Sequence, residues 1–295
     1  MIKSVGVVGT GMLGAAIARR LAQAGHKVFV YNRTSQKALD LTSCGCVYAS
    51  SPKEVAQLSD LVITVVRDGS AVLDVSFGKD GIIHGCETAP VIADMSTISP
   101  MDSVKINKRF EEHNIVWLGT PVMGGPDAAA DGRLVLIADG DKASFDGIRD
   151  VFDVLCNKIH YVGKSGTAHA VKLCMNMQIA SLAVSLSEGI TLARIMNVPP
   201  ETFLDVLNST YFGTGMSRNK AFKMINSQYN ATFTLENLTK DLNIICDTAK
   251  PSDVYLEMSQ TILSMYTRAL SGGMGDLDYT GILEFVRQNT KSDNS

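Results

Sequence analysis

The chain has 295 residues, of which 45% are hydrophobic and 19% are charged, and its formal net charge at pH 7 is −3. This length allows two ordinary domains with well-buried cores, and the composition is that of a soluble globular protein. The slightly acidic balance argues against nucleic acid as a partner, because binding to phosphates requires a basic face.

Membrane, secretion and metal signals are also weak in this sequence. No uninterrupted apolar run reaches about 20 residues, so we expect no membrane span. The N-terminus lacks the pattern of a signal peptide, and we therefore expect a cytoplasmic protein. The six cysteines are scattered, and the closely spaced pair Cys44 and Cys46 is a poor metal signature, so we predict no metal site.

Predicted strands and helical segments alternate in the first half of the chain. The strands are predicted at residues 4–9, 26–32, 61–66, 90–96, 115–122, 133–140 and 158–163. The first two helices between them are predicted at residues 12–25 and 35–45. Strands separated by helices form βαβ units, and runs that are apolar throughout suit strands covered on both faces. We predict an α/β Rossmann domain with a doubly wound, mainly parallel sheet over residues 1–163.

The second half has helical patterns only. One pattern, residues 168–196, is apolar nearly all round, which predicts a buried helix about 40 Å long. Further helices are predicted at residues 199–210, 217–227, 235–250, 253–272 and 278–290. We therefore predict an all-helical domain over residues 164–295, headed by the long helix, with residues 291–295 frayed. A helix this long and apolar also suggests an interface between subunits, so we expect a homodimer or homotetramer.

Three glycines, Gly9, Gly11 and Gly14, follow the first predicted strand and open the first helix. In a dinucleotide-binding turn the first glycine permits the tight turn, the second lets the backbone approach a pyrophosphate, and the third lets the helix pack closely. The pyrophosphate then lies on the free N–H groups of the helix N-terminus. The alternative is a glycine turn that has lost its nucleotide. The residues assigned to a cofactor here are Gly9, Thr10, Gly11, Met12, Leu13, Gly14 and Val66.

The second predicted strand ends in Asn32, Arg33 and Thr34, where an acidic residue commonly binds the ribose 2′-hydroxyl of NAD. A carboxylate would repel a 2′-phosphate, whereas an arginine binds it and can stack on adenine. Asn32 and Thr34 can add hydrogen bonds, and Lys37 is a further candidate. We predict NADP(H) as the preferred cofactor and NAD(H) as a weaker one. The alternative for Arg33 is a solvated charge on a loop.

Two later segments suggest substrate chemistry. Gly124 and Gly125 precede a helix-like turn, and consecutive glycines there expose N–H groups that can bind a carboxylate, although such a turn can need glycine for its shape alone. Lys172 and Asn176 are four residues apart and share one face of the long helix. A lysine in an apolar helix is costly unless it has a partner or a role such as proton transfer, and the alternative is a side chain that reaches solvent. His169, three residues earlier, is expected to be a surface or helix-capping residue.

Six segments occur along the chain in a fixed order: GVVGTGMLGAAIARRLAQAGHKV (6–28), YNRT (31–34), DMSTISP (94–100), LGTPVMGGPDAAADGRL (118–134), GKSGTAHAVKLCMN (163–176) and FTLENLTKDLNII (233–245). In this combination the chain resembles the β-hydroxyacid dehydrogenases, which include 3-hydroxyisobutyrate dehydrogenase, tartronate semialdehyde reductase and glyoxylate/succinic semialdehyde reductase. The segments span nearly the whole chain, and as a set they are specific for this family.

The resemblance implies a role for each matching residue. Lys172 matches the catalytic lysine that donates a proton to the carbonyl oxygen during reduction, and Asn176 matches an asparagine near the reacting centre. Thr97 matches a threonine beside both nicotinamide and substrate. Gly124 and Gly125 match the glycine pair whose amides hold the substrate carboxylate.

The helical half contributes further matches, and one position departs from the family pattern. Lys240 matches a lysine that reaches the cofactor side, and Asp241 beside it is assigned to the substrate. Phe233 stands where an aromatic residue lies near the substrate. The family usually has serine before the glycine pair, whereas this chain has Met123. A methionine at this substrate-binding position makes the pocket more apolar. This change suggests a substrate other than the smallest polar acids, or a relaxed range.

The expected function is NADPH-dependent reduction of a small, carboxylate-bearing aldehyde or keto acid, such as succinic semialdehyde or glyoxylate, to a hydroxy acid. A competing hypothesis is NAD(P)-dependent oxidation of 3-hydroxyisobutyrate or another β-hydroxy acid. Two more distant hypotheses are an imine-reducing relative and a non-enzymatic protein that binds NADPH. Lys172 argues against these last two, because such relatives replace or lose the lysine.

Overall fold

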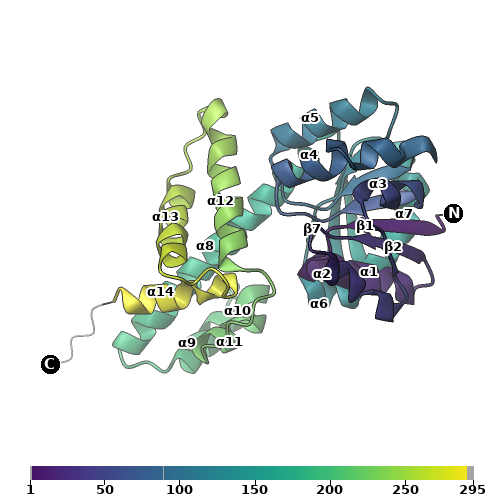
Figure 1. The fold of residues 1–295 in the computed structure, drawn as a ribbon. Helices are drawn as coiled ribbons and strands as arrows, with labels where there is room; N and C mark the ends of the chain where they lie inside the picture. Colours follow the sequence, from purple (N-terminus) through teal and green to yellow (C-terminus); the bar gives the residue numbers. More distant parts are fainter. Residues whose placement is uncertain (1, 89, 291–295) are drawn as a thin grey trace. The chain divides into compact units, whose positions relative to one another are not determined.

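The computed structural model describes residues 2–88 and 90–290, so the predicted fraying of residues 291–295 lies outside the described part. The chain divides into two compact units, Met1–Leu173 and Cys174–Ser295. The first is an α/β unit and the second is helical, which confirms the predicted fold class (Figure 1). The predicted boundary after residue 163 precedes the long helix α8 (Thr167–Ile195), whereas this division falls inside it.

In the described part of the chain, a sheet of nine strands with the order β3-β2-β1-β4-β5-β6-β8-β7 forms the α/β unit, and β9 pairs with β8. The strands are β1 (Ser4–Val8), β2 (Lys27–Tyr31), β3 (Val47–Tyr48), β4 (Leu61–Thr64), β5 (Val91–Asp94), β6 (Trp117–Gly119), β7 (Val122–Met123), β8 (Leu134–Asp139) and β9 (Cys156–Gly163). Strands β1 to β6 pair in parallel, and β8 runs antiparallel to β6 and β7. The strand order reverses between β1 and β4, and ligands of doubly wound folds bind at the carboxyl ends of strands at this point.

Helices cover both faces of the sheet. They are α1 (Met12–Gln23), α2 (Ser35–Leu39), α3 (Pro52–Gln57), α4 (Gly69–Phe77), α5 (Pro100–Glu111), α6 (Pro126–Ala130) and α7 (Lys142–Leu155), with 3₁₀ turns at Thr42–Cys44 and Ile82–Thr88. Because successive strand residues point to opposite faces, Val7 and Ile63 pack in the core cluster under α1 and α7. Val8 and Val62 pack in the other cluster, under α3, α4 and α5 (Figure 1).

Three details of the α/β unit differ from the sequence predictions. The strand predicted at residues 115–122 is divided into β6 and β7, although both pair with β8 in one continuous register. Pro121 lies at the division, since proline has no N–H to donate to a ladder. The helix predicted at residues 35–45 ends early, at Leu39, and a 3₁₀ turn follows it. Strand β3 was not predicted, because two residues are too short to show a periodicity.

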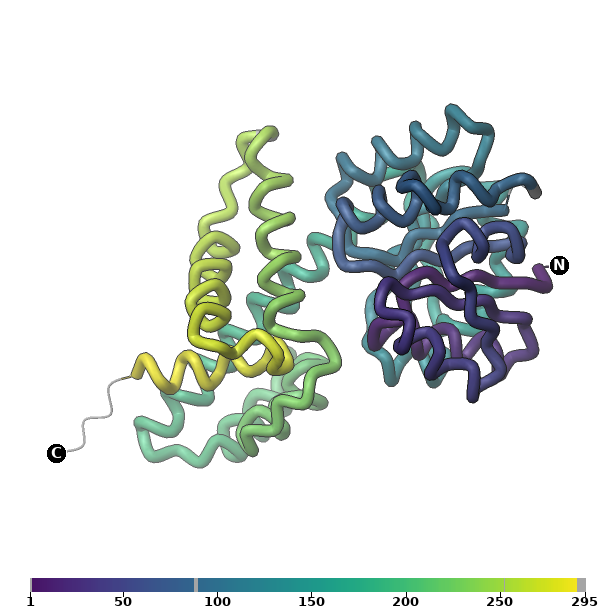
Figure 2. Tube along the Cα trace, viewed as in Figure 1, coloured from purple at the N-terminus to yellow at the C-terminus, as the bar shows by residue number. Residues whose placement is uncertain are grey.

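The helical unit continues from α8. Its other helices are α9 (Pro200–Ser209), α10 (Gly215–Asn219), α11 (Ala221–Ile225), α12 (Leu235–Ala249), α13 (Glu257–Ser271) and α14 (Ile282–Gln288), with 3₁₀ turns at Lys250–Ser252 and Tyr279–Gly281. Helices α12 and α13 run side by side (Figure 2). The single helix predicted at residues 217–227 is two short helices that meet at Lys220.

The long helix was predicted at residues 168–196 and is observed as α8, with 29 residues. Its predicted burial on all sides is only partly correct. Ile190 is fully buried, whereas Leu192 and Ile195 are 62% and 56% exposed. By length and composition α8 could cross a membrane, a test that the core helix of a soluble protein also passes.

Candidate active site

Each position of the loop after β1 has a different reason to be glycine. Gly9 has a φ of +99°, and an added Cβ would lie 2.3 Å from the Val65 carbonyl oxygen. A Cβ on Gly14 would lie 2.0 Å from the Gly9 carbonyl oxygen, so α1 approaches the loop this closely only without a side chain. A Cβ on Gly11 would meet no protein atom within 4 Å. The fold itself does not need glycine there, whereas a ligand that approaches the backbone does, and these residues therefore fit a dinucleotide.

The N-terminus of α1 is open to an anion. Gly11 caps the helix without a side-chain hydrogen bond, and the first turn has no acidic residue. The first N–H groups of a helix have no acceptor within the helix, and the helix dipole favours negative charge beside them. Met12, in this turn, is 48% exposed, and Leu13 is half-buried. This geometry suits the predicted pyrophosphate.

Asn32 supports the glycine loop from the end of β2. Its Oδ1 accepts a hydrogen bond from the N–H of Thr10 at 3.0 Å, and its Nδ2 donates to the Thr34 carbonyl oxygen at 3.0 Å. The amide therefore has partners inside the protein and braces the loop, and its predicted bond to the cofactor stays a prediction. Thr34 and Arg33 are exposed, and the Arg33 side chain forms no hydrogen bond or ion pair with the described residues. Arg33 thus remains available to a ligand.

A buried carboxylate organises the segments that follow β4 and β5. Asp94, fully buried at the end of β5, accepts hydrogen bonds from the Thr64 hydroxyl at 2.6 Å and from the Ser96 N–H at 3.3 Å. The Ser96 hydroxyl in turn accepts a hydrogen bond from the Val66 N–H at 3.0 Å. These bonds hold Val66 and the half-buried Thr97 at the carboxyl edge of the sheet, where the sequence predicted a cofactor.

Lys172 lies against the segment that carries the glycine pair. Its Nζ donates to the Val122 carbonyl oxygen at 2.7 Å and lies 3.5 Å from the Met123 sulfur. Gly124 has a φ of +117°, and a Cβ there would lie 2.8 Å from the Leu134 side chain, so this position needs glycine for shape. Gly125 caps the short helix α6. The structure thus brings Lys172, Met123 and the glycine pair together within the α/β unit.

A second polar group lies in the helical unit. Asn176 and Asp241 are each 1% exposed, and Asn176 Nδ2 donates to Asp241 Oδ2 at 2.6 Å. The other carboxylate oxygen of Asp241 pairs with Lys240 Nζ at 2.7 Å. Asp241 therefore orients both neighbours from a buried position, and its assignment to the substrate stays a prediction. Asn176 Oδ1 is buried and has no hydrogen-bond partner in the described part of the chain.

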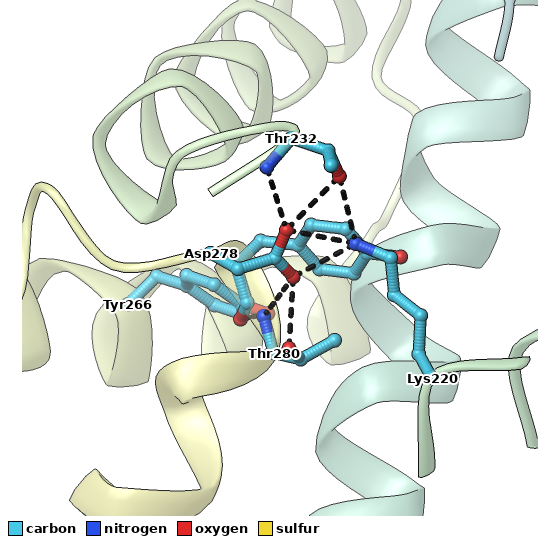
Figure 3. Close-up of polar contacts among 6 residues, drawn as sticks. Lys220, Thr232, Tyr266, Asp278 and Thr280 are labelled. Atoms are coloured by element: carbon cyan, nitrogen blue, oxygen red, sulfur yellow. Dashed lines mark hydrogen bonds and ion pairs between the residues drawn. The ribbon is translucent and has the colours of Figure 1, made fainter. Parts of the chain in front are cut away.

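An ion-paired cluster around Asp278, whose polar contacts Figure 3 shows, lies next to Phe233 through Tyr279. The Phe233 carbonyl oxygen accepts a hydrogen bond from the Tyr279 N–H at 2.9 Å, and the two rings lie 5.9 Å apart. Asp278 accepts hydrogen bonds from Lys220 Nζ at 2.8 Å and from the Thr232 N–H at 3.1 Å. Burial raises the pKa of Asp278, but Lys220 and the hydrogen bonds outweigh it and keep that pKa below its usual value. The cluster fixes the loop before α12.

The predicted residues therefore fall into two groups, one in each unit. The α/β unit holds Gly9, Thr10, Gly11, Met12, Leu13, Gly14, Asn32, Arg33, Thr34, Val66, Thr97, Met123, Gly124, Gly125 and Lys172, and the helical unit holds Asn176, Phe233, Lys240 and Asp241. Lys172 and Asn176 lie one turn apart on α8, as their spacing predicted.

The expectation that His169 is a surface or capping residue is wrong, because its side chain is fully buried. Its Nε2 lies 3.4 Å from Asp94 Oδ2. Asp139, also fully buried, ends β8, and burial raises its pKa against the opposing effects of the Ala168 N–H and His169. Neither aspartate was predicted from the sequence to have a role. The available signal was that each ends an apolar strand, where a carboxylate is buried only with partners.

Two known protein families match successive parts of the chain. Residues 4–163 match the NAD binding domain of 6-phosphogluconate dehydrogenase, and residues 166–286 match the NAD-binding domain of NADP-dependent 3-hydroxyisobutyrate dehydrogenase. The chain is 33% identical to glyoxylate/succinic semialdehyde reductase 1 of Arabidopsis thaliana, over 96% of this chain and 98% of that protein. It is 30% identical to the chloroplastic reductase 2 of the same plant, over 96% and 79% of the two chains.

Solved structures share the fold. Psf3 in complex with NADP+ and 2-OPP superposes with a TM-score of 0.89 at 23% sequence identity, over 96% of this chain and 99% of that one. The family matches cover both units, and the relatives are similar along nearly the whole chain. The chain therefore belongs to the β-hydroxyacid dehydrogenase family of NAD(P)-dependent oxidoreductases.

Proposed function

We propose that this protein is an NADPH-dependent reductase of small aldehyde or keto acids, with Lys172 as the proton donor. The observation that carries the proposal is the position of Lys172 Nζ. It lies 2.7 Å from the Val122 carbonyl oxygen, just before Gly124 and Gly125, which are the proposed anchor for a substrate carboxylate. Two similar proteins are named glyoxylate/succinic semialdehyde reductases, which favours this substrate class.

The side chains have complementary tasks in such a reaction. A bound nicotinamide supplies the hydride for the carbonyl carbon. The Lys172 ammonium donates its proton to the carbonyl oxygen as a general acid. Asn176 keeps its Oδ1 as an acceptor, because Asp241 engages only its Nδ2. Holding the carbonyl near the acid and the hydride donor supplies much of the rate, since bound reactants no longer have to meet by diffusion.

The preference for NADP(H) is part of the proposal and rests on Arg33. This side chain is exposed at the end of β2, and Asn32 and Thr34 beside it are uncharged, so neither neighbour repels a 2′-phosphate. The match to a family domain described as NADP-dependent and the fold neighbour solved with NADP+ agree with it. Comparing kcat/KM for NADPH and NADH tests the preference, and a clear advantage for NADH would reject it.

The test of the catalytic role is the variant Lys172→Ala. We expect kcat for succinic semialdehyde or glyoxylate to fall by about 100-fold or more, because general acid catalysis contributes about that much, while NADPH affinity stays within a few-fold. Lys164→Ala is the matched control, since Lys164 is an exposed lysine just before the same helix. Near-normal turnover by Lys172→Ala would exclude Lys172 as the acid.

A second candidate function is oxidation of 3-hydroxyisobutyrate or another β-hydroxy acid. The match of residues 166–286 to the 3-hydroxyisobutyrate dehydrogenase domain favours it. A panel of semialdehydes with NADPH or NADH, and of β-hydroxy acids with NADP+ or NAD+, separates the two directions by kcat/KM. If the protein binds NADPH but turns over no member of the panel, it is a non-enzymatic binder and the proposal fails.

We also propose a cytoplasmic homo-oligomer, either a dimer or a tetramer. The exposed apolar side chains of α8, including Leu192 and Ile195, favour burial against a second copy of the chain. Light scattering in solution tests this proposal, and a monomer at micromolar concentration would contradict it.

A further inference from the structure

Three ionisable side chains meet where α8 begins, and the proposed chemistry uses none of them. His169, Asp94 and Asp139 are all fully buried, and they come from α8 and from the ends of β5 and β8. His169 Nε2 lies 3.4 Å from Asp94 Oδ2, and the ring stacks on Trp117 with centroids 6.0 Å apart and planes at 16°. Burial of such groups is costly unless they are hydrogen-bonded or paired.

Asp139 ties the first turn of α8 to the sheet. Its Oδ2 accepts a hydrogen bond from the Ala168 N–H at 2.7 Å, and its Oδ1 accepts one from the Gly119 N–H at 3.0 Å. One of the N–H groups that a helix leaves free at its start is thus satisfied from another element. This bond fixes the backbone of the turn, but it does not by itself fix the rotation of the helix about its axis.

His169 makes the second contact between this turn and the sheet, a close approach of its Nε2 to Asp94 Oδ2 that is not a hydrogen bond. Its partner Asp94 uses Oδ1 for the Thr64 hydroxyl and the Ser96 N–H, so Oδ2 is the oxygen that faces the imidazole. A Cβ on Gly119 would lie 3.0 Å from the His169 Cε1, which shows how closely β6 approaches the ring. The ring is therefore confined between Trp117, Gly119 and Asp94, and two attachments on one turn define its rotation.

Lys172 lies three residues after His169, which is about 4.5 Å along the helix axis and on a neighbouring part of its surface. We propose that His169 is a positioning residue, whose contact with Asp94 sets the rotation of the first turn of α8 and so directs the Lys172 side chain to its place beside Val122. The inference rests on the proposed function of Lys172. Because Asp94 also holds Ser96, the same carboxylate aligns the segment of Thr97 with the helix that carries the proposed acid.

The test compares His169→Gln with His169→Asn in the full chain. The glutamine amide nitrogen can occupy about the position of the imidazole Nε2, whereas asparagine is too short to reach Asp94. His113→Asn is the matched control, because His113 is exposed in the turn after α5 and its ring lies within hydrogen-bond distance of the Arg109 carbonyl oxygen. The readouts are kcat for the best aldehyde acid, KM for NADPH, and hydrogen exchange of the peptide spanning residues 164–173.

We expect His169→Asn to lower kcat at least tenfold, because a misplacement of about 1 Å in a catalytic group can cost about 100-fold. KM for NADPH should stay within about twofold, and exchange of the 164–173 peptide should rise. His169→Gln should keep kcat within about threefold and retain slow exchange. A merely structural role would instead lower the melting temperature and leave kcat per folded molecule unchanged.

Two results would overturn the inference. One is an asparagine variant with normal kcat and normal exchange, and the other is equal impairment of the glutamine and asparagine variants. If the unsubstituted protein turns over no substrate, the proposed function fails, and hydrogen exchange still decides the attachment. Faster exchange in the asparagine variant alone supports it, and unchanged exchange in both variants refutes it.

Discussion

The glycine loop allows a sharp separation between what the fold requires and what the cofactor requires. Gly11 and Gly14 lie one turn apart, and each can be changed to alanine. At Gly11 the new Cβ meets no protein atom within 4 Å, and the backbone there (φ −68°) suits alanine. The loss of a good helix N-cap and the gain from a less flexible unfolded chain nearly cancel, so stability should change by less than about 1 kcal/mol.

Cofactor binding by Gly11→Ala should nevertheless weaken. The methyl group occupies the space through which a pyrophosphate approaches the N–H groups of α1, and a hydrogen bond to a charged group contributes about 1.5–3 kcal/mol. Loss of one such bond corresponds to an increase of about 10-fold to 150-fold in the Kd for NADPH. Titration of NADPH fluorescence measures Kd, and thermal melting measures stability.

Gly14→Ala should behave in the opposite way. Its Cβ would lie 2.0 Å from the Gly9 carbonyl oxygen. Because this oxygen belongs to the backbone, α1 or the loop must shift to make room for the methyl group. Overpacking of this kind costs about 3 kcal/mol or more, which lowers the melting temperature by about 6–12 °C. Normal NADPH affinity in Gly11→Ala, or normal stability in Gly14→Ala, would refute the assignment of these roles.

Three further predictions follow from the charged groups. Arg33→Asp should raise KM for NADPH by about 30-fold or more with little change for NADH, as steady-state kinetics with both cofactors will show, and equal effects on both would contradict a contact with the 2′-phosphate. Asp241→Ala should lower kcat about tenfold or more because Asn176 loses its partner, and unchanged kinetics would show that this orientation is unimportant. The pKa of Asp278 is held below its usual value, so its contribution to stability is present above about pH 4 and is lost as the pH falls through the lower, folded-state pKa. Asp278→Asn should remove this part of the acid dependence of unfolding followed by circular dichroism, and an identical pH profile would contradict the pairing with Lys220.

Most of the features that could be predicted from the sequence came from local patterns of neighbouring residues. The strand, the three glycines and the helix of the cofactor loop are consecutive, and the periods of strands and helices are properties of neighbouring residues. The spacing of Lys172 and Asn176 placed both on one face of α8 for the same reason. The two-unit architecture and the family followed from segments whose order along the chain is itself sequence information.

The tertiary structure decided the partners, because those contacts join residues far apart in the chain. Asn32 looked like a ligand for the ribose phosphate, yet its amide braces Thr10, which is 22 residues away. His169 looked exposed, yet Asp94 and Trp117 enclose it. No local pattern in the sequence shows that strands β5, β6 and β8 end beside one another. Burial and pairing depend on which elements pack together, and packing is a property of the whole fold. The sequence therefore indicated the residues that we propose carry the chemistry, and only the structure decided which residues hold them in place.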